Sequence, residues 1–237
     1  MTRLSVNINK IATLRNARGG NIPDVVLAAK RIESYGAHGI TVHPRPDERH
    51  IRYDDVKQLK KVVSTELNVE GNPVQKFMDL VISVQPHQVT LVPDAEDQLT
   101  SNHGWDTIKH KDYLKEIISE LKKHGIRTSI FVDPVPEQVE NSLATGTDRI
   151  ELYTEYYAEN YHKDPDEAVK DFTRCAGKAK EMGLGINAGH DLNLDNIGFF
   201  SKSLPRLDEV SIGHALIAES LYEGLNTVIS KYLKHLQ

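Results

Sequence analysis

The sequence predicts an α/β protein, a (β/α)8 TIM barrel with extra helices. Short strand-like runs alternate with longer amphipathic runs along all 237 residues, and no linker or charge run divides the chain. Eight such units occur, and about 250 residues is a usual length for this barrel. Polar residues end nearly every strand-like run, which favours a barrel over an open doubly wound sheet with one switch point. We therefore expect a single TIM-barrel domain over residues 1–237.

Each unit pairs a short apolar run with a following amphipathic one. The expected strands are Leu4–Asn7, Gly39–His43, Leu67–Glu70, Gln88–Val92, Arg127–Asp133, Arg149–Leu152, Gly185–Asn187 and Glu209–Ile212. The expected helices are Pro23–Tyr35, Asp54–Ser64, Pro73–Val84, Ile108–His124, Glu137–Ala144, Pro165–Met182, Asp195–Ser201 and Ala215–Glu223. Two connections, Pro93–Thr107 and Tyr153–Asp164, are longer than a simple loop requires, so we expect a lid, an extra helix or a surface excursion there.

The composition excludes several classes of protein. The net charge is −5, so the clustered Lys and Arg of a nucleic-acid-binding surface are not expected. One cysteine, Cys175, excludes an intramolecular disulfide and a Cys-rich zinc site. No apolar run approaches the roughly 20 residues that span a bilayer, and the N-terminus has no signal-peptide pattern. We expect a cytoplasmic protein with no nucleic-acid or membrane partner.

The first strand-to-helix corner, Asn7–Gly20, is polar, carries three cations and ends in paired glycines. It predicts an anion-binding loop in which the guanidinium of Arg18 holds a phosphate or carboxylate through two hydrogen bonds. A solvated basic loop without a ligand is the alternative.

The second corner places His43 at the end of a strand, with Arg45 and His50 on the loop that follows. Pro44 and Pro46 restrict the backbone on both sides of Arg45, so its position is fixed before a ligand binds. A strand-terminal histidine is often only structural, but the fixed arginine beside it favours a functional corner.

Two later strands end in a carboxylate, Glu70 and Glu151. A carboxylate in a core is costly unless it is paired, whereas one that faces a cleft can act as a general base with a raised pKa. The alternative for Glu151 is an ion pair with a barrel arginine, for example Arg149 or Arg127.

Two further corners end in Gly-His, at Gly189-His190 and Gly213-His214. Glycine lets backbone N–H groups approach a ligand, and histidine exchanges a proton near neutral pH. Gly213 and His214 begin the last predicted helix, whose N-terminus suits a phosphate. An alternative zinc or iron site would combine His43, Glu70, His190 and His214. No metal-binding motif occurs, however, and cationic loops suit anionic substrates better, so we expect no metal.

At these corners the chain resembles, end to end, the pyridoxine 5′-phosphate synthase family. The matching segments are Val6-Asn7-Ile8, Ile11-Ala12-Thr13-Leu14-Arg15-Asn16-Ala17-Arg18-Gly19, Gly39-Ile40-Thr41-Val42-His43-Pro44-Arg45, Leu91-Val92-Pro93, Asn187-Ala188-Gly189-His190 and Ile212-Gly213-His214-Ala215. The resemblance implies a homo-octamer that condenses 3-amino-2-oxopropyl phosphate with 1-deoxy-D-xylulose 5-phosphate. Pyridoxine 5′-phosphate, inorganic phosphate and water would form without a metal or organic cofactor.

The family's pattern also implies a role for each matching residue. His43 and Glu70 would accept protons, and His190 would donate one. Glu151 would stabilise charge during the reaction. The deoxyxylulose phosphate would be held by Arg45, His50 and Thr100, and the amino-oxopropyl phosphate by Asn7, Arg18, Gly213 and His214. Thr100 lies in the connection 93–107, which fits a lid that keeps water from reactive imines.

Two positions depart from the family's pattern. Asn9-Lys10 stands where Asp-His is common, and Asp191 stands where glycine is common. By position, Asn9 and Lys10 would contact the deoxyxylulose phosphate, and Asp191 would face the phosphate or the substrate ammonium group. We hypothesise that Lys10 and Asp191 compensate each other, as a cation and an anion within one cleft.

From the residues alone, two other function classes remain open. An aldolase or isomerase acting on a phosphorylated sugar would share the anion sites, but a Schiff-base aldolase needs a strand lysine and no predicted strand has one. A non-catalytic phosphate-binding protein would keep the anion loops without needing four acid–base residues.

Overall fold

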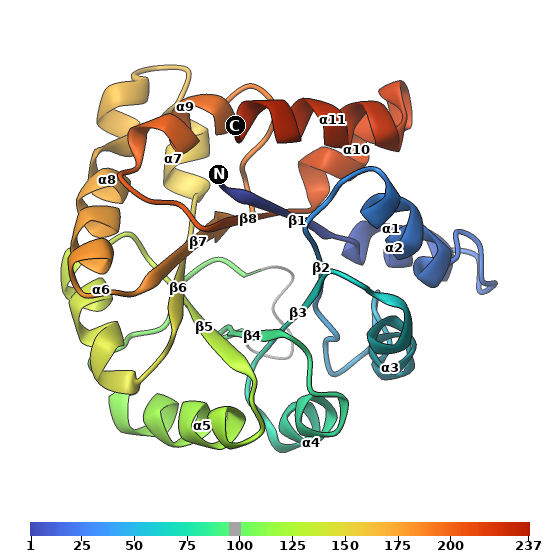
Figure 1. Ribbon diagram of the computed structural model, residues 1–237, viewed down its shortest axis with the longest axis horizontal. Helices are drawn as coiled ribbons and strands as arrows, with labels where there is room; N and C mark the ends of the chain where they lie inside the picture. The colour runs from blue at the N-terminus through green and yellow to red at the C-terminus, as the bar shows by residue number, and fades with distance from the viewer. Residues whose placement is uncertain (95–100) are drawn as a thin grey trace.

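The computed structural model describes residues 1–94 and 101–237, and it confirms the predicted barrel. Eight parallel strands are paired in chain order, and β8 pairs with β1 to close the barrel. Figure 1 shows these strands at the centre, surrounded by helices. The strands are β1 (Arg3–Asn7), β2 (Gly39–Val42), β3 (Glu66–Gly71), β4 (Gln88–Leu91), β5 (Arg127–Val132), β6 (Arg149–Leu152), β7 (Gly185–Gly189) and β8 (Glu209–Ile212).

The helices of the outer ring follow the strands along the chain. They are α1 (Asn9–Asn16), α2 (Val25–Ser34), α3 (Tyr53–Val62), α4 (Gln75–Val84), α5 (Lys111–Lys123), α6 (Pro136–Ser142), α7 (Glu155–Asn160), α8 (Pro165–Glu181), α9 (Ile197–Ser203), α10 (His214–Glu223) and α11 (Leu225–His235). A short 3-10 turn, η1 (Leu143–Thr145), follows α6. No helix in the described part of the chain is long and apolar enough to cross a membrane.

Helix α1 corrects the prediction of a loop at the first corner. Its eight residues give little periodicity, but Ile11 and Ala12 are buried on one side, and so is Arg15. The Arg15 guanidinium binds both carboxylate oxygens of Asp55, at 2.7 and 2.9 Å. This buried ion pair attaches α1 to the start of α3, beneath the loop that carries His50.

Two further helices were not among the eight predicted by residue range. One of them, α7, lies in the connection Tyr153–Asp164, where an extra helix was one of the expected outcomes. α11 follows α10, so Gly213 and His214 do not begin the last helix. Val228, Ile229 and Tyr232 of α11 are buried at helical spacing, and this pattern marks the helix in the sequence.

The structure also moves the start of α4. This helix begins at Gln75 rather than at Pro73, because the Asn72 amide donates to the backbone oxygen of Asp94 (2.9 Å) instead of capping the helix. The glycine that follows each of three helices has a positive φ: +98° at Gly36, +71° at Gly125 and +77° at Gly183.

Side chains that alternate along the strands separate an apolar exterior from a polar barrel interior. Leu4 and Val6 of β1 are fully buried in the core between the strands and the helices. Ser5, between them, lies 2.7 Å from the hydroxyl of Thr41 on β2, and Asn68 of β3 donates to the same hydroxyl at 3.4 Å. The interior is therefore filled by hydrogen-bonded polar side chains rather than by the branched apolar residues usual in such barrels.

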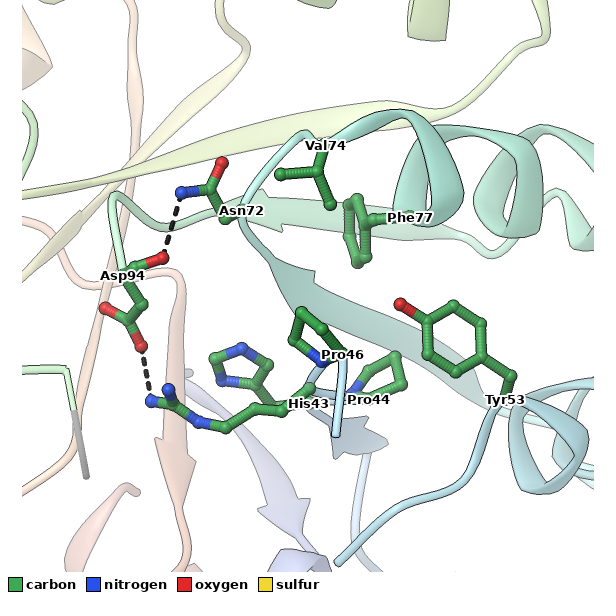
Figure 2. Close-up of a pocket in the computed structure, with 9 residues that line it drawn as sticks. His43, Pro44, Pro46, Tyr53, Asn72, Val74, Phe77 and Asp94 are labelled. Atoms are coloured by element: carbon green, nitrogen blue, oxygen red, sulfur yellow. Dashed lines mark hydrogen bonds and ion pairs between the residues drawn. The ribbon is translucent and has the colours of Figure 1, made fainter. Parts of the chain in front are cut away.

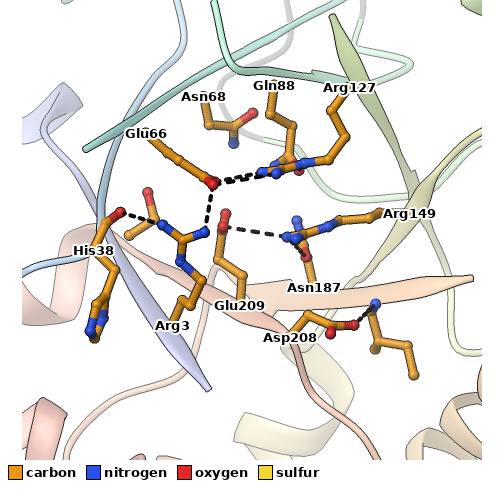
Figure 3. A network of polar contacts seen from close by, with 12 residues as sticks. Arg3, His38, Glu66, Asn68, Gln88, Arg127, Arg149, Asn187, Asp208 and Glu209 are labelled. Atoms are coloured by element: carbon orange, nitrogen blue, oxygen red, sulfur yellow. Dashed lines mark hydrogen bonds and ion pairs between the residues drawn. The ribbon is translucent and has the colours of Figure 1, made fainter. Parts of the chain in front are cut away.

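A layer of ion pairs crosses the barrel at the amino ends of the strands (Figure 3). Glu66 pairs with Arg3 at 2.5 Å and with Arg127 at 2.6 Å, and Arg149 pairs with Glu209 at 3.4 Å. Burial alone would raise the pKa of Glu66, but Arg127 and Arg3 lower it to about 2. Arg127 and Arg149, the alternative partners expected for Glu151, are thus paired with Glu66 and Glu209 instead.

Candidate active site

Five predicted residues meet at the carboxyl ends of the strands. Asn7 ends β1, Glu70 lies near the end of β3 and Glu151 lies on β6, while His43 and His190 directly follow β2 and β7. In a closed parallel barrel these ends share one face, where the active sites of TIM-barrel enzymes lie. The Asn7 amide donates to Glu70 Oε2 (3.4 Å), and His43 Nδ1 lies 3.9 Å from the same oxygen.

His43 is held as a neutral imidazole. Its backbone N–H donates to the side-chain oxygen of Asn9 (2.9 Å), and its ring meets that of His50 edge-on at 6.2 Å. Burial, followed by the positive charge of Arg45, lowers the pKa of His43 well below its ordinary value. A buried neutral imidazole beside a carboxyl group has a free ring nitrogen that can accept a proton.

Glu70 and Glu151 have a strengthened affinity for protons. Burial and the charge of Glu151 raise the pKa of Glu70 well above its ordinary value. Burial and the charge of Glu209 raise the pKa of Glu151 to about 7. Oε2 of Glu151 has no hydrogen-bond partner among the described residues. Glu151 can therefore take up and release a proton near neutral pH, and Glu70 binds a proton more readily than an ordinary carboxylate does.

The pKa of His190 is shifted in the opposite direction to that of His43. Its Nδ1 lies 2.9 Å from Oδ2 of Asp191, and its ring contacts that of Tyr153 edge-on at 5.6 Å. Burial lowers the pKa of His190, but the hydrogen bond and charge of Asp191 outweigh it, and the net pKa is raised. A histidine whose neighbouring carboxylate favours the protonated ring suits a proton donor. Asp191 therefore faces His190 and not a phosphate site.

A cationic region adjoins His43. Arg45 is buried on the β2–α3 connection, and Lys10 lies in the first turn of α1. Burial, followed by the charges of Arg45 and Lys10, lowers the pKa of His50 to about 4, so His50 is neutral and can donate or accept a hydrogen bond.

A pocket of about 140 Å³ opens beside His43 (Figure 2). It is lined by His43, Pro44, Arg45, Pro46, Tyr53, Asn72, Val74, Phe77 and Asp94. The two prolines and the aromatic rings give it one apolar wall, while Arg45 and Asp94 make the other wall charged. Such a pocket fits a small ligand with both an apolar and an anionic end.

The N-terminus of α10 is the second candidate anion site. Gly213 is its N-cap, and no side chain accepts a hydrogen bond from the first turn. Free N–H groups and the helix dipole favour a phosphate there. A Cβ atom on Gly213 would lie 3.2 Å from Cβ of Asn7, so glycine keeps this corner close to β1.

Three predicted substrate residues are less directly placed. Arg18 is exposed beyond the end of α1, and His214 is exposed at the start of α10. Thr100 lies outside the described residues. The amide oxygen of Asn9 is used by the backbone of His43, which gives Asn9 a positioning contact. Within residues 1–94 and 101–237, no group of three His, Cys, Asp or Glu is placed so that it could hold a metal ion.

Sequence reasoning missed Asp94. Its carboxylate pairs with Arg45, and Ser101 Oγ donates to the same oxygen at 2.7 Å. The signal was present, because Asp94 follows the run Leu91-Val92-Pro93 as a carboxylate beyond a buried strand. It resembles Glu70 and Glu151 in that respect.

Comparison with known proteins decides the family. Residues 4–237 match the family described as "Pyridoxal phosphate biosynthesis protein PdxJ". The chain belongs to the PdxJ family. The pyridoxine 5′-phosphate synthase of Christiangramia forsetii is 65% identical over 237 residues, which is 100% of both chains. That of Flavobacterium johnsoniae is 60% identical, also over 100% of both. This PdxJ chain is therefore an enzyme of vitamin B6 biosynthesis, as the resemblance implied.

Solved structures support the fold of this PdxJ chain. A phosphoribosylanthranilate isomerase from Thermotoga maritima matches with a TM-score of 0.63 and 14% identity, over 100% of this chain and 98% of that one. A thiamine phosphate pyrophosphorylase from Pyrococcus furiosus matches with a TM-score of 0.66 and 12% identity, over 99% and 95%. At such identities the likeness concerns the fold alone.

Proposed function

We propose that this PdxJ chain condenses 3-amino-2-oxopropyl phosphate with 1-deoxy-D-xylulose 5-phosphate to give pyridoxine 5′-phosphate, inorganic phosphate and water. The observation that carries the proposal is that two histidines at one end of the barrel have pKa values shifted in opposite directions. Burial and the charge of Arg45 lower the pKa of His43, whereas Asp191 raises that of His190, and both rings lie at the same end of the barrel as the carboxyl groups of Glu70 and Glu151. Amine condensation, dehydration and ring closure require repeated proton transfers in both directions.

The acid–base residues have distinct roles in this proposal. His43 and Glu70 accept protons, and the raised pKa of Glu70 strengthens its affinity for a proton. His190 donates a proton to a departing oxygen. Glu151 lies buried at the same face and stabilises the positive charge of iminium-like species.

Two phosphorylated substrates require two anion sites, and the cleft offers two. Arg45 and His50, with Lys10 at the rim, hold the deoxyxylulose phosphate. The backbone of Gly213 and His214 holds the amino-oxopropyl phosphate, with Asn7 beside it. Arg18 and Thr100 complete the two sets in the family's pattern.

The decisive experiment supplies both phosphates to the purified protein. We expect a pyridine-ring chromophore and one equivalent of inorganic phosphate. A Glu70→Gln variant should lower turnover by roughly 10²- to 10⁴-fold, the usual contribution of a general base. The exposed Glu159→Gln variant on α7 serves as the control and should retain full turnover. Folded wild-type protein that releases neither product would overturn the proposal.

We also propose that the enzyme is cytoplasmic, where phosphorylated metabolites are retained, and that it assembles as a homo-octamer. Apolar side chains support self-association: Leu14 of α1 is 58% exposed, Ile22 86%, and Tyr222 of α10 91%. Light scattering should give about eight times the 26.6 kDa subunit mass, and a monomer at micromolar concentration would contradict the assembly.

A further inference from the structure

We propose that Asp191 is a positioning residue for His190: it accepts a hydrogen bond from Nδ1 and so directs Nε2 of the same ring to the substrate. The proposal rests on the proposed function, in which His190 is the proton donor. It replaces the expectation that Asp191 contacts a substrate directly. Glycine, common in the family at this position, could supply no such hydrogen bond.

The backbone turn after β7 brings the two side chains together. His190 has a φ of +50°, a left-handed conformation that is uncommon for residues other than glycine. With His190 in this conformation, Oδ2 of Asp191 lies 2.9 Å from Nδ1 of the His190 ring. Strained residues of this kind persist only where the surrounding structure holds them in place.

Contacts on both sides of His190 hold the turn. The Thr154 hydroxyl donates to the backbone oxygen of Gly189 and accepts from the backbone N–H of Asp191 (3.3 Å). On the other side, a Cβ on Gly189 would lie 2.2 Å from the backbone oxygen of Ser211, so β7 and β8 are in close contact there. The turn therefore has little freedom to move away from the observed geometry.

The hydrogen bond has a chemical consequence for His190. When the ring donates through Nδ1 to a carboxylate, Nε2 carries the transferable proton in the imidazolium and accepts a proton in the neutral ring. The carboxylate then stabilises the imidazolium without itself taking the proton. Asp191 thus sets both the direction of proton donation and the fraction of His190 that is charged.

Other acidic groups around His190 act in the same direction as Asp191. Glu151 and Asp94 favour the imidazolium through their charges, while burial opposes it. His43 is also near enough to be affected, since the charge of His190 lowers the pKa of His43. The Tyr153 ring contacts His190 by its edge and has a raised pKa, so it contributes no charge near neutral pH.

The test separates a positioning role from a structural or substrate-binding one. Histidine-labelled wild-type protein and the Asp191→Asn variant are titrated by NMR, with the His190 signal assigned by its loss in His190→Gln. We expect the midpoint of His190 to fall by about one pH unit or more in Asp191→Asn. The matched control is Asp195→Asn, an exposed residue of the same connection, and it should leave the midpoint unchanged.

Kinetics supply the second readout. In Asp191→Asn the alkaline limb of the kcat profile should move to lower pH, so that kcat falls more at alkaline than at acidic pH. KM for both phosphates should change less than about twofold.

An unchanged His190 midpoint in folded variant protein would overturn the inference, and so would a rise in KM at constant kcat. Asp191→Gly, which also removes the carboxylate, gives the same readouts if Asp191→Asn does not fold. If the wild-type protein forms no product, the proposed function fails, while the NMR midpoint still tests the contact.

Discussion

Nη2 of Arg45 lies 2.5 Å from Oδ2 of Asp94, and the two side chains are only 4% and 3% exposed. This pair joins the β2–α3 connection to the chain that follows β4 (Figure 2). Ser101 and Asn72 bind the same aspartate, through its carboxylate and its backbone oxygen. The cation proposed for the deoxyxylulose phosphate is thus held in position by an acid that the sequence analysis did not assign.

Replacing Asp94 should therefore destabilise the protein. Asp94→Ala leaves the Arg45 guanidinium buried without its carboxylate, and such changes typically cost about 3–5 kcal/mol in the free energy of unfolding. Asp47→Ala is the matched control, because Asp47 pairs with Arg49 with its side chain 48% exposed, and exposed pairs are worth about 1 kcal/mol or less. Urea unfolding of both variants measures the difference. Equal losses would mean that the buried pair does not hold this corner.

The approach of β7 to β8 leads to a second prediction. Gly189→Ala places a methyl group 2.2 Å from the backbone oxygen of Ser211, which cannot move as a side chain would. We expect a loss of about 2 kcal/mol or more in stability and a loss of turnover, since His190 follows directly. Gly177→Ala in α8 meets nothing within 4 Å and should instead stabilise the protein by about 0.5–1 kcal/mol. Thermal unfolding compares the two, and a stable, active Gly189→Ala would contradict the predicted clash.

The sequence could predict the barrel because strand and helix signals alternate eight times and polar residues lie at the ends of nearly all the strand-like runs. It could also predict which residues meet, since topology alone brings the ends of parallel strands to one face. His43, Glu70, Glu151 and His190 were found in this way. Helix α1 was missed because eight residues show too little periodicity, and its burial depends on Arg15 pairing with Asp55 far along the chain.

The interaction partners of the site residues were harder to predict than the site residues themselves. Nothing local indicates that Arg127 and Arg149 are taken by Glu66 and Glu209, which leaves Glu151 without an arginine. The direction of a side chain is equally hidden. Asp191 could be assigned to the cleft from its position, but its contact with His190 depends on a left-handed backbone turn.

The structure also bears on the hypothesis that Lys10 and Asp191 compensate each other. Lys10 acts on His50 and lowers its pKa, whereas Asp191 binds His190 and favours its charged form. Because the two side chains act on different histidines, the effects of Lys10→Ala and Asp191→Gly on kcat/KM should be additive within about 0.5 kcal/mol. A double-mutant cycle measures this coupling. A larger coupling would restore the compensation hypothesis.

Glu151 should make stability depend on pH in a way that a glutamine removes. Its pKa is raised from 4.5 to about 7 in the folded protein, by burial and by the charge of Glu209. Below about pH 4.5 the carboxyl group is protonated in both the folded and the unfolded chain, so it costs nothing. Between about pH 4.5 and 7 the unfolded chain ionises first, and stability is lost as the pH rises; above about pH 7 the loss is complete.

Glu151→Gln cannot ionise, so it should be more stable than the wild type at about pH 8, by up to about 3 kcal/mol at 1.4 kcal/mol per pKa unit. The advantage should shrink toward zero at about pH 4.5, although turnover falls because the charge at this position is gone. Urea unfolding across this range gives the difference curve, with the exposed Glu159→Gln as a control that stays within about 0.5 kcal/mol of wild type throughout. A difference between Glu151→Gln and wild type that does not vary with pH would show that Glu151 is ionised at the same pH in the folded and unfolded chains, and its burial would then carry no electrostatic cost.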